Sequence, residues 1–166
     1  MKKQEITLLW EYNYWANRRL LARADGLSVA QLTDKLPYMW DSILRTMAHV
    51  LGAEWAWRQR VQEGISPAAL LDRDQFTTLE VLNQRWDEEE TLMRDYLAGL
   101  SDAHLERVVT YQNTKGDSFS RPLWQLLTHV VNHGTQHRSE VALYLTNFDR
   151  SPGDMDITVF LSEQGV

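Results

Sequence analysis

Apolar residues recur with the 3.6-residue period of an α-helix over four long stretches of the chain. The stretches cover residues 6–24, 41–63, 79–98 and 122–147. Four amphipathic helices of about 20 residues, each about 30 Å long, favour a helix bundle over any fold built on a sheet. The pattern therefore predicts an all-α protein, a four-helix bundle.

Capping and turn residues set the predicted helix ends. Asp41 is the expected N-cap of the second helix, which should end near Glu63 and Gly64, and Pro122 suits the first position of the last helix. Ser28 and Gln31 form the pattern of a capping box, which predicts a short connecting helix that ends before Pro37.

Two segments depart from the helical period. Between Leu105 and Arg121, residues 107–111 have the composition of a strand and residues 113–117 that of a turn, so we expect a short β-hairpin or an irregular excursion before the last helix. This excursion suggests that the helices do not follow a simple up-down-up-down order. The tail from Ser151 is expected to be extended and to dock four apolar residues on the bundle: Ile157, Val159, Phe160 and Leu161.

Polar residues interrupt two of the helical patterns. Asn13 and Asn17 project into the middle of the apolar stripe of the first helix, where an unpaired amide would be costly to bury. We therefore expect a polar group to face them. The acidic run from Asp87 to Glu90 is expected to be a solvent-exposed surface, because unpaired carboxylates are seldom buried.

Composition limits the class of protein. The chain has 166 residues, of which 43% are hydrophobic and 24% charged, enough for one core, so we expect a single domain over residues 1–166. It has no cysteine, which excludes disulfides, thiolate metal sites and cysteine nucleophiles. Any metal ion must be bound by nitrogen and oxygen atoms.

The charge balance argues against nucleic acid as a partner. The formal net charge is −6, and Arg45, Arg58 and Arg60 make at most a small basic patch. The first residues carry charges before any long apolar run, unlike a signal peptide, and no apolar stretch approaches the roughly 18 residues of a membrane span. A soluble, cytoplasmic protein without a membrane or nucleic-acid partner is expected.

Three histidines recur every four residues in the last predicted helix, within THVVNHGTQHRSE. His129, His133 and His137 lie about 40° apart around the helix and share one face. Two imidazoles at positions i and i+4 can chelate one transition metal, because their side chains converge over one turn. His49, in the second helix, would complete a site of three nitrogens if the two helices pack side by side. Three neutral nitrogens without a thiolate resemble an open catalytic site, with a position left for water or substrate.

Two further residues on this face have open roles. Because His129 and His137 are about 12 Å apart along the helix, His129 is expected to support the site or the structure rather than bind the same ion. Glu140 is the candidate catalytic residue, since it could orient an imidazole or act as a general base. A salt bridge from Glu140 to Arg138 or to the first helix is the alternative.

A structural interpretation of the histidines also stands, since helical histidines are often hydrogen-bonded core residues of a metal-free interaction protein. His104, in a predicted turn, is expected at the surface. Tyr12, Tyr144 and Trp57 could line a pocket, although aromatic residues at helical spacing are more often core.

Four sequence blocks, in this order and spacing, resemble the DinB/YfiT-like superfamily of proposed metalloenzymes. The blocks are YNYWANRRLL, SILRTMAHVLGAEWAW, RPLWQLLTHVVNHGTQHRSEVALYL and PGDMDITVFL. The resemblance implies a four-helix bundle with an unusual crossover, commonly a homodimer, that binds a divalent metal such as nickel or zinc. Carried over by position, the ligands are His49, His133 and His137, whereas His129 matches an additional histidine that is not usually a ligand.

The resemblance also implies a class of reaction. Relatives include thiol-dependent S-transferases that use mycothiol or bacillithiol and a mycothiol-dependent maleylpyruvate isomerase, so we expect a small-molecule substrate and a low-molecular-weight thiol co-substrate. A divalent ion would act as a Lewis acid on a water molecule or a thiol, in a transferase or a hydrolase. The alternative is a non-catalytic stress-response or binding module stabilised by its metal. Seven Trp and six Tyr, many for a small bundle, agree with a homodimer interface.

Overall fold

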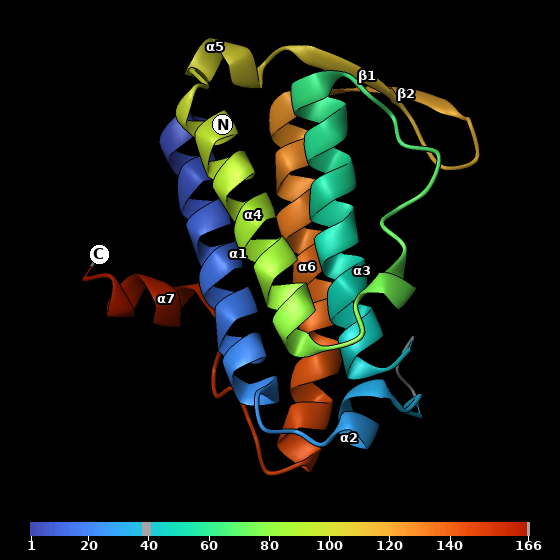
Figure 1. Cartoon of the computed structure of the whole chain (residues 1–166). Helices are drawn as coiled ribbons and strands as arrows, with labels where there is room; N and C mark the ends of the chain where they lie inside the picture. Colours follow the sequence, from blue (N-terminus) through green and yellow to red (C-terminus); the bar gives the residue numbers. More distant parts are fainter. Residues whose placement is uncertain (38–40, 166) are drawn as a thin grey trace.

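The computed structural model describes residues 1–37 and 41–165, and four long helices dominate it (Figure 1). Their bounds are Lys3–Ala24 for α1, Ile43–Arg58 for α3, Leu79–Ala98 for α4 and Leu123–Asn147 for α6. Helix α3 continues as a single π-helical turn, η1 (Gln59–Glu63), so the predicted end near Glu63 is correct although the last turn is wider than an α-helix. The predicted all-α bundle with a short hairpin is confirmed.

The direction of the helices explains the longest loop. Helices α1 and α6 run one way along the bundle, and α3 and α4 run the other way (Figure 1). Helix α6 packs on α1 and α3, and α4 covers the other side of the same two helices. Because α3 and α4 are parallel neighbours, the connection over residues 64–78 must travel back along the bundle; it contains one 3₁₀ turn, η2 (Arg73–Gln75). The topology is not up-down-up-down, as predicted, but the crossover is this loop and not the excursion before α6.

Helix starts follow the local capping chemistry. The predicted capping box begins α2 (Val29–Thr33): Ser28 Oγ accepts from the Gln31 backbone N–H at 3.2 Å, and Gln31 Oε1 accepts from the Ser28 N–H at 2.9 Å. The predicted N-cap of α3 is off by one residue, because Ser42 caps the helix. The Asp41 carboxylate instead accepts hydrogen bonds from two arginines, Arg45 and Arg73, at 3.0 Å each.

The excursion before α6 is a β-hairpin that follows a short helix, α5 (Asp102–Leu105). Strands β1 (Val108–Gln112) and β2 (Ser118–Pro122) pair in antiparallel register, with Tyr111 opposite Phe119. In the turn, Asn113 Oδ1 accepts from the backbone N–H groups of Lys115 and Asp117, as the turn chemistry predicts.

The C-terminal tail is a short helix, which corrects the predicted extended conformation. Helix α7 (Ile157–Glu163) is too short for its apolar period to be read from the sequence. Phe160 is buried and lies 5.6 Å from the ring of Trp15 and 6.1 Å from that of Tyr12, so the predicted docking of this residue is confirmed. Ile157 and Leu161 pack beside it, whereas Val159 lies outside this cluster.

Two apolar cores follow one another along the bundle. One core lies near the hairpin and contains Trp10, Met93 and Leu127, and the other lies near α2 and contains Leu20, Met47 and Leu145. Along α1, α3, α4 and α6, the residues between the two cores are polar and buried. The centre of the bundle is therefore a polar layer between two apolar ones.

Part of the acidic run on α4 belongs to this layer. Asp87 and Glu88 are exposed as predicted, but Glu89 and Glu90 are buried, and the prediction for these two is wrong. Glu89 pairs with Arg58 and Arg85, and Glu90 pairs with Arg18 and Arg94; each pairing supplies the charge partner that makes burial tolerable. Arg85 and Arg94 are one turn away on α4, but Arg58 and Arg18 come from other helices, and the local sequence does not reveal these two.

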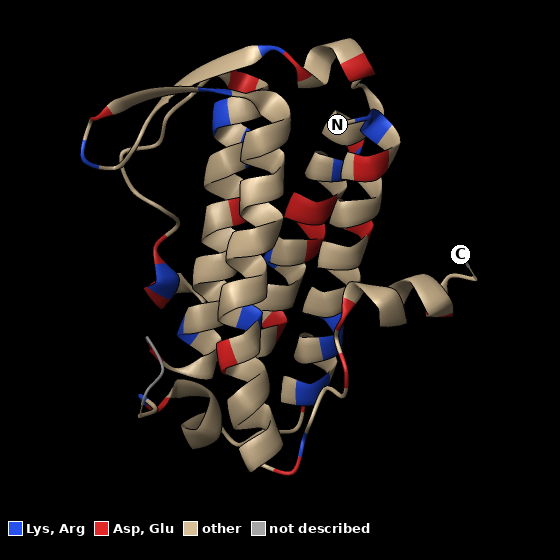
Figure 2. Cartoon of the chain, turned by 180° about the vertical axis from the view of Figure 1, so that it is seen from behind, with Lys and Arg blue, Asp and Glu red and all other residues tan. Residues whose placement is uncertain are grey.

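The suggested basic patch does not form, because the side chains of Arg58 and Arg60 are buried. In the view of Figure 2, both basic and acidic residues are scattered over several helices. Within residues 1–37 and 41–165, none of the helices combines the length and hydropathy that a membrane span requires.

Candidate metal centre

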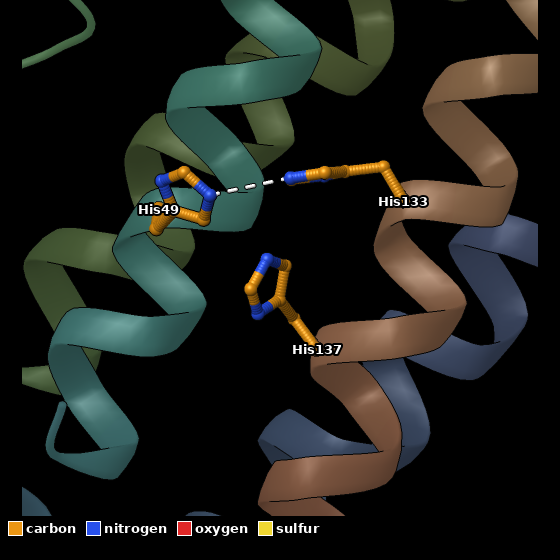
Figure 3. Close-up of side chains that lie close together, drawn as sticks. All are labelled: His49, His133 and His137. Carbon is orange, nitrogen blue, oxygen red and sulfur yellow. Dashed lines mark hydrogen bonds between the residues drawn. The ribbon is translucent and has the colours of Figure 1, made fainter. Parts of the chain in front are cut away.

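Helices α3 and α6 bring three of the five histidines together. His49 projects from α3, and His133 and His137 project from consecutive turns of α6, toward a common space between the two helices (Figure 3). Since α3 and α6 are adjacent and antiparallel, residues 84 and 88 positions apart in the sequence meet at one level of the bundle. The side-by-side packing that the spacing required is present.

The three rings are close enough to share one ion. Nε2 of His49 lies 3.2 Å from Nε2 of His133, and one nitrogen from each of the three rings lies within 4.8 Å of the others. The ring centroids are 4.7–5.1 Å apart. Three nitrogens that each lie 2.0–2.1 Å from a tetrahedral ion are about 3.4 Å apart, so the His49–His133 pair already has the spacing of ligands.

Burial keeps two of the imidazoles neutral. Burial, with a smaller contribution from the neighbouring imidazole of His137, lowers the pKa of His49 and of His133 to about 4. At neutral pH each ring therefore keeps a nitrogen lone pair, which is the form that binds a metal ion. Both side chains are only half-buried, so the space between the rings remains within reach of a small molecule.

Glu140 contacts the third histidine. Its Oε2 lies 3.3 Å from Nδ1 of His137, one turn earlier on α6. An ionised carboxylate can only accept, so Nδ1 of His137 is the donor in this contact and Nε2 is the nitrogen on the other side of the ring. In Figure 3 the ring nitrogen of His137 farther from its backbone points toward the space between His49 and His133. The alternative salt bridge from Glu140 to Arg138 is absent from the described residues, because the Arg138 guanidinium points into the bundle.

These residues fit a divalent metal ion better than they fit a packed core. Two Nε2 atoms face each other at 3.2 Å, and one nitrogen of His137 lies within 4.8 Å of the ligand atoms of both rings. A hydrogen bond between two imidazoles uses only one such pair, whereas one ion can bind all three nitrogens. Three imidazole nitrogens without a thiolate are a donor set that a divalent transition metal accepts.

A buried network behind the histidines holds the helices in register. Asn13 and Asn17 on α1 donate from their amide nitrogens to Oε1 of Glu54 on α3, at 2.7 and 3.0 Å. Their amide oxygens accept from the guanidinium of Arg138 on α6, and the indole N–H of Trp86 on α4 donates to Oε2 of Glu54 at 2.9 Å. The expected polar partners of the two asparagines are thus a carboxylate and a guanidinium.

This network acts on the site through the helices. Arg138 follows His137 directly, and Glu54 lies five residues after His49, so the asparagines tie together the two helices that carry the histidines. Each amide uses both its donor and its acceptor, which fixes the rotation of α3 and α6 about their axes. The sequence analysis does not predict that Glu54 and Arg138 belong to a buried network. The signal for Glu54 is that it is a charged residue within the apolar stripe of its helix.

The other candidate residues lie away from the three-histidine cluster. His129 is one turn away on α6 and is not part of the cluster; its ring is 6.0 Å from that of His133 and 5.1 Å from that of Trp57. His104 is exposed on α5, as predicted. Tyr12 lines a cavity on the α1 side of α6, and Tyr144 packs on the core near α2.

Comparison with known proteins agrees with the resemblance seen in the sequence. The model of the DinB family matches residues 1–165. This chain belongs to the DinB family. It is 24% identical over 161 residues to Protein DinB of Bacillus subtilis (strain 168), a match that covers 93% of this chain and 94% of the relative. DinB family membership and the three-histidine cluster are compatible with a metal-binding protein.

Proposed function

We propose that this DinB-family protein binds one divalent metal ion, nickel or zinc, through His49, His133 and His137. The observation that carries the proposal is the convergence of three imidazole nitrogens within 4.8 Å from two facing helices. The neutral state of His49 and His133 supports it, because neither ring must lose a proton before it binds at neutral pH.

We further propose a metal-dependent enzyme of the thiol-dependent S-transferase or hydrolase type. When bound, the ion supplies Lewis acidity, which favours the anionic form of a thiol or of water. The chain has no cysteine, so in the transferase reaction the sulfur comes from a low-molecular-weight thiol. The sulfur forms a bond to an electrophilic carbon of a small-molecule substrate, the leaving group departs with its electron pair, and the thiol proton passes to solvent.

In this proposal Glu140 orients the site. Its carboxylate holds the proton on Nδ1 of His137 and so presents Nε2 to the cluster. The 3.3 Å contact favours this role over general-base catalysis, because a carboxylate engaged with an imidazole N–H is less free to take a proton from substrate. The buried network of Asn13, Asn17, Glu54 and Arg138 keeps the two ligand helices in place.

Elemental analysis of untagged protein, purified without chelators, tests the metal site. Wild-type protein should contain about one equivalent of nickel or zinc, and His49→Ala and His133→Ala should each lose it. His104→Ala is the matched control, since His104 is exposed and far from the cluster in the sequence, and it should retain the metal. A wild-type protein that neither contains metal nor takes it up on reconstitution would contradict the proposal.

The reaction class needs a separate test. The metal-loaded protein is incubated with bacillithiol, mycothiol or glutathione and a panel of electrophiles, and the loss of free thiol is followed. Thiol consumption that depends on the metal and disappears in His49→Ala supports the transferase. Hydrolysis of an electrophile without thiol loss supports the hydrolase, and bound metal with no turnover in either assay favours a metal-stabilised binding module.

The remaining expectations concern partners and location. We propose a homodimer that acts on a small molecule in the cytoplasm. Light scattering after size-exclusion chromatography checks the dimer, because the chain mass is 19.4 kDa and a dimer has twice that value.

A further inference from the structure

A small pocket opens where the α3–α6 seam meets the hairpin. Its volume is about 190 Å³, and it is lined by residues from α3, β1, β2 and α6. These residues are Trp57, Tyr111, Arg121, Gln125, Leu126 and His129. None of them is acidic, although the chain carries a net charge of −6.

His129 links the pocket to the three-histidine cluster, because it lines the pocket and its ring also lies near that of His133. The ring of His129 is 6.0 Å from that of His133 on one side and 5.1 Å from that of Trp57 on the other. Trp57 in turn meets Tyr111 edge-on at 4.9 Å. One turn of α6, about 6 Å, separates His129 from His133, so the pocket lies next to the three-histidine cluster.

The pocket also has positive charge that the protein leaves unbalanced. Arg60 does not line the pocket, but its guanidinium is buried beside two lining rings, 4.8 Å from the centroid of Trp57 and 5.8 Å from that of Tyr111. Arg121 is exposed at the pocket. Within the described residues these two arginines contact only backbone carbonyls and rings, and neither has a carboxylate partner. Most other arginines of the bundle pair with Asp or Glu, as Arg58, Arg85 and Arg94 do.

We propose that this pocket binds the substrate, and that the substrate is a small planar organic anion, an aromatic or conjugated carboxylate. Aromatic walls accept a flat apolar group, and a guanidinium binds a carboxylate with two parallel hydrogen bonds. The volume is below that of pockets for drug-sized ligands, so the ligand has about one ring. This inference rests on the proposed function for its link to a reaction, but binding in the pocket needs no metal.

Binding of benzoate to metal-free, full-length protein tests the inference, with neutral benzamide as the matched ligand. Ligand-observed NMR titrations give the dissociation constants. We expect saturable binding of benzoate at least about tenfold tighter than that of benzamide, since one charge-assisted hydrogen bond is worth a factor of this order. Arg121→Gln should remove most of the difference in affinity between benzoate and benzamide. Arg60→Met should also weaken the binding of benzoate.

Control variants separate this inference from the metal site. Arg23→Gln removes an exposed arginine outside the pocket and should leave benzoate binding unchanged. His49→Ala should also bind benzoate normally, even though it loses the metal. Because Arg121 is exposed, Arg121→Gln should fold, and circular dichroism checks this for both pocket variants.

Three outcomes would contradict the proposal that the pocket binds a carboxylate. These are no saturable binding of benzoate, equal affinity for benzoate and benzamide, or an affinity that Arg121→Gln does not change. If benzoate binds as expected while wild-type protein takes up no metal, the result supports the binding pocket and contradicts the proposed metalloenzyme.

Discussion

At the scale of single residues, Gly134 shows how closely the buried network fills the bundle. A Cβ atom at this position would lie 2.6 Å from Nη1 of Arg138 and 3.1 Å from Oδ1 of Asn13. Arg138 is only 3% exposed and is hydrogen-bonded to Asn13, Asn17 and Thr135, so it cannot move aside freely. The absent side chain is what allows the guanidinium to cross from α6 to α1.

Gly134→Ala should therefore destabilise the protein despite the better helix propensity of alanine. Alanine gains about 1 kcal/mol over glycine in a helix, whereas overpacking costs about 1–3 kcal/mol, and the tight contact favours the upper part of that range. We expect a net loss of about 1–2 kcal/mol in urea unfolding. Gly99→Ala is the control, because its Cβ would meet only ordinary contacts at 3.5 Å or more, and its stability should hardly change. Equal stabilities of Gly134→Ala and wild type would contradict this.

The two neutral histidines make the stability of the metal-free protein depend on pH. The pKa values of His49 and His133 are about 4 in the folded protein, against about 6.5 in the unfolded chain. Between these values the unfolded chain binds more protons, so their contribution to stability is complete above pH 6.5 and is lost as the pH falls toward 4.

Thermal unfolding in the presence of a chelator checks this pH dependence. The melting temperature of wild-type protein should fall more between pH 7.5 and pH 4.5 than that of the double variant His49→Gln, His133→Gln. The double variant lacks both titrating groups. The carboxylates titrate equally in the two proteins, so the difference between the two falls in melting temperature reports the two histidines. Identical losses would show that neither imidazole is held neutral by the fold.

At the scale of elements, Phe160 is the one buried residue of α7, although Ile157 and Leu161 pack beside it and Glu163 pairs with Arg19 of α1. Phe160 is 3% exposed and packs on Tyr12 and Trp15 of α1, while Thr158 on the same helix faces solvent. A seven-residue helix is not stable alone in water, so these contacts hold it in place.

Phe160→Ala should cost about 3 kcal/mol of unfolding free energy, the lower end of the range for a buried phenylalanine, because the surface helix can partly collapse into the space. Urea unfolding measures it. Thr158→Ala should change stability by less than about 0.5 kcal/mol, since the residue makes no core contact. A loss below about 1 kcal/mol for Phe160→Ala would mean that α7 does not depend on this docking.

At the scale of the whole molecule, a metal ion at the histidines would join α3 to α6 at the level of the polar layer. An ion that binds only the folded protein stabilises it by about 2.7 kcal/mol at a free concentration of 100 times its dissociation constant. For a chain of this size that corresponds to a rise of roughly 5–10 °C in Tm.

Differential scanning calorimetry with added nickel or zinc measures that rise. It should appear in wild type and in His104→Ala, and it should be absent from His133→Ala. A similar rise in His133→Ala would show that the ion binds elsewhere on the protein.

The sequence by itself determined the elements of this protein. The helical period of the apolar residues predicts the four long helices, and Asn113 and its neighbours predict the hairpin turn. The spacing of His133 and His137 places two imidazoles on one face of α6. These features depend on residues within one or two turns of each other, so local pattern is enough to predict them. The asparagine pair likewise signalled a buried polar partner without naming it.

Only the tertiary structure decided which distant residues meet. It places His49 beside His133, and it makes Glu54 and Arg138 the hydrogen-bond partners of Asn13 and Asn17. It also buries Glu89 and Glu90, which the sequence predicts to be exposed. It also placed Arg60, Trp57 and Tyr111 beside His129 at one end of the seam. The physical reason is that the cost of burying a charge or an amide depends on partners supplied by other helices, and helix packing selects those partners.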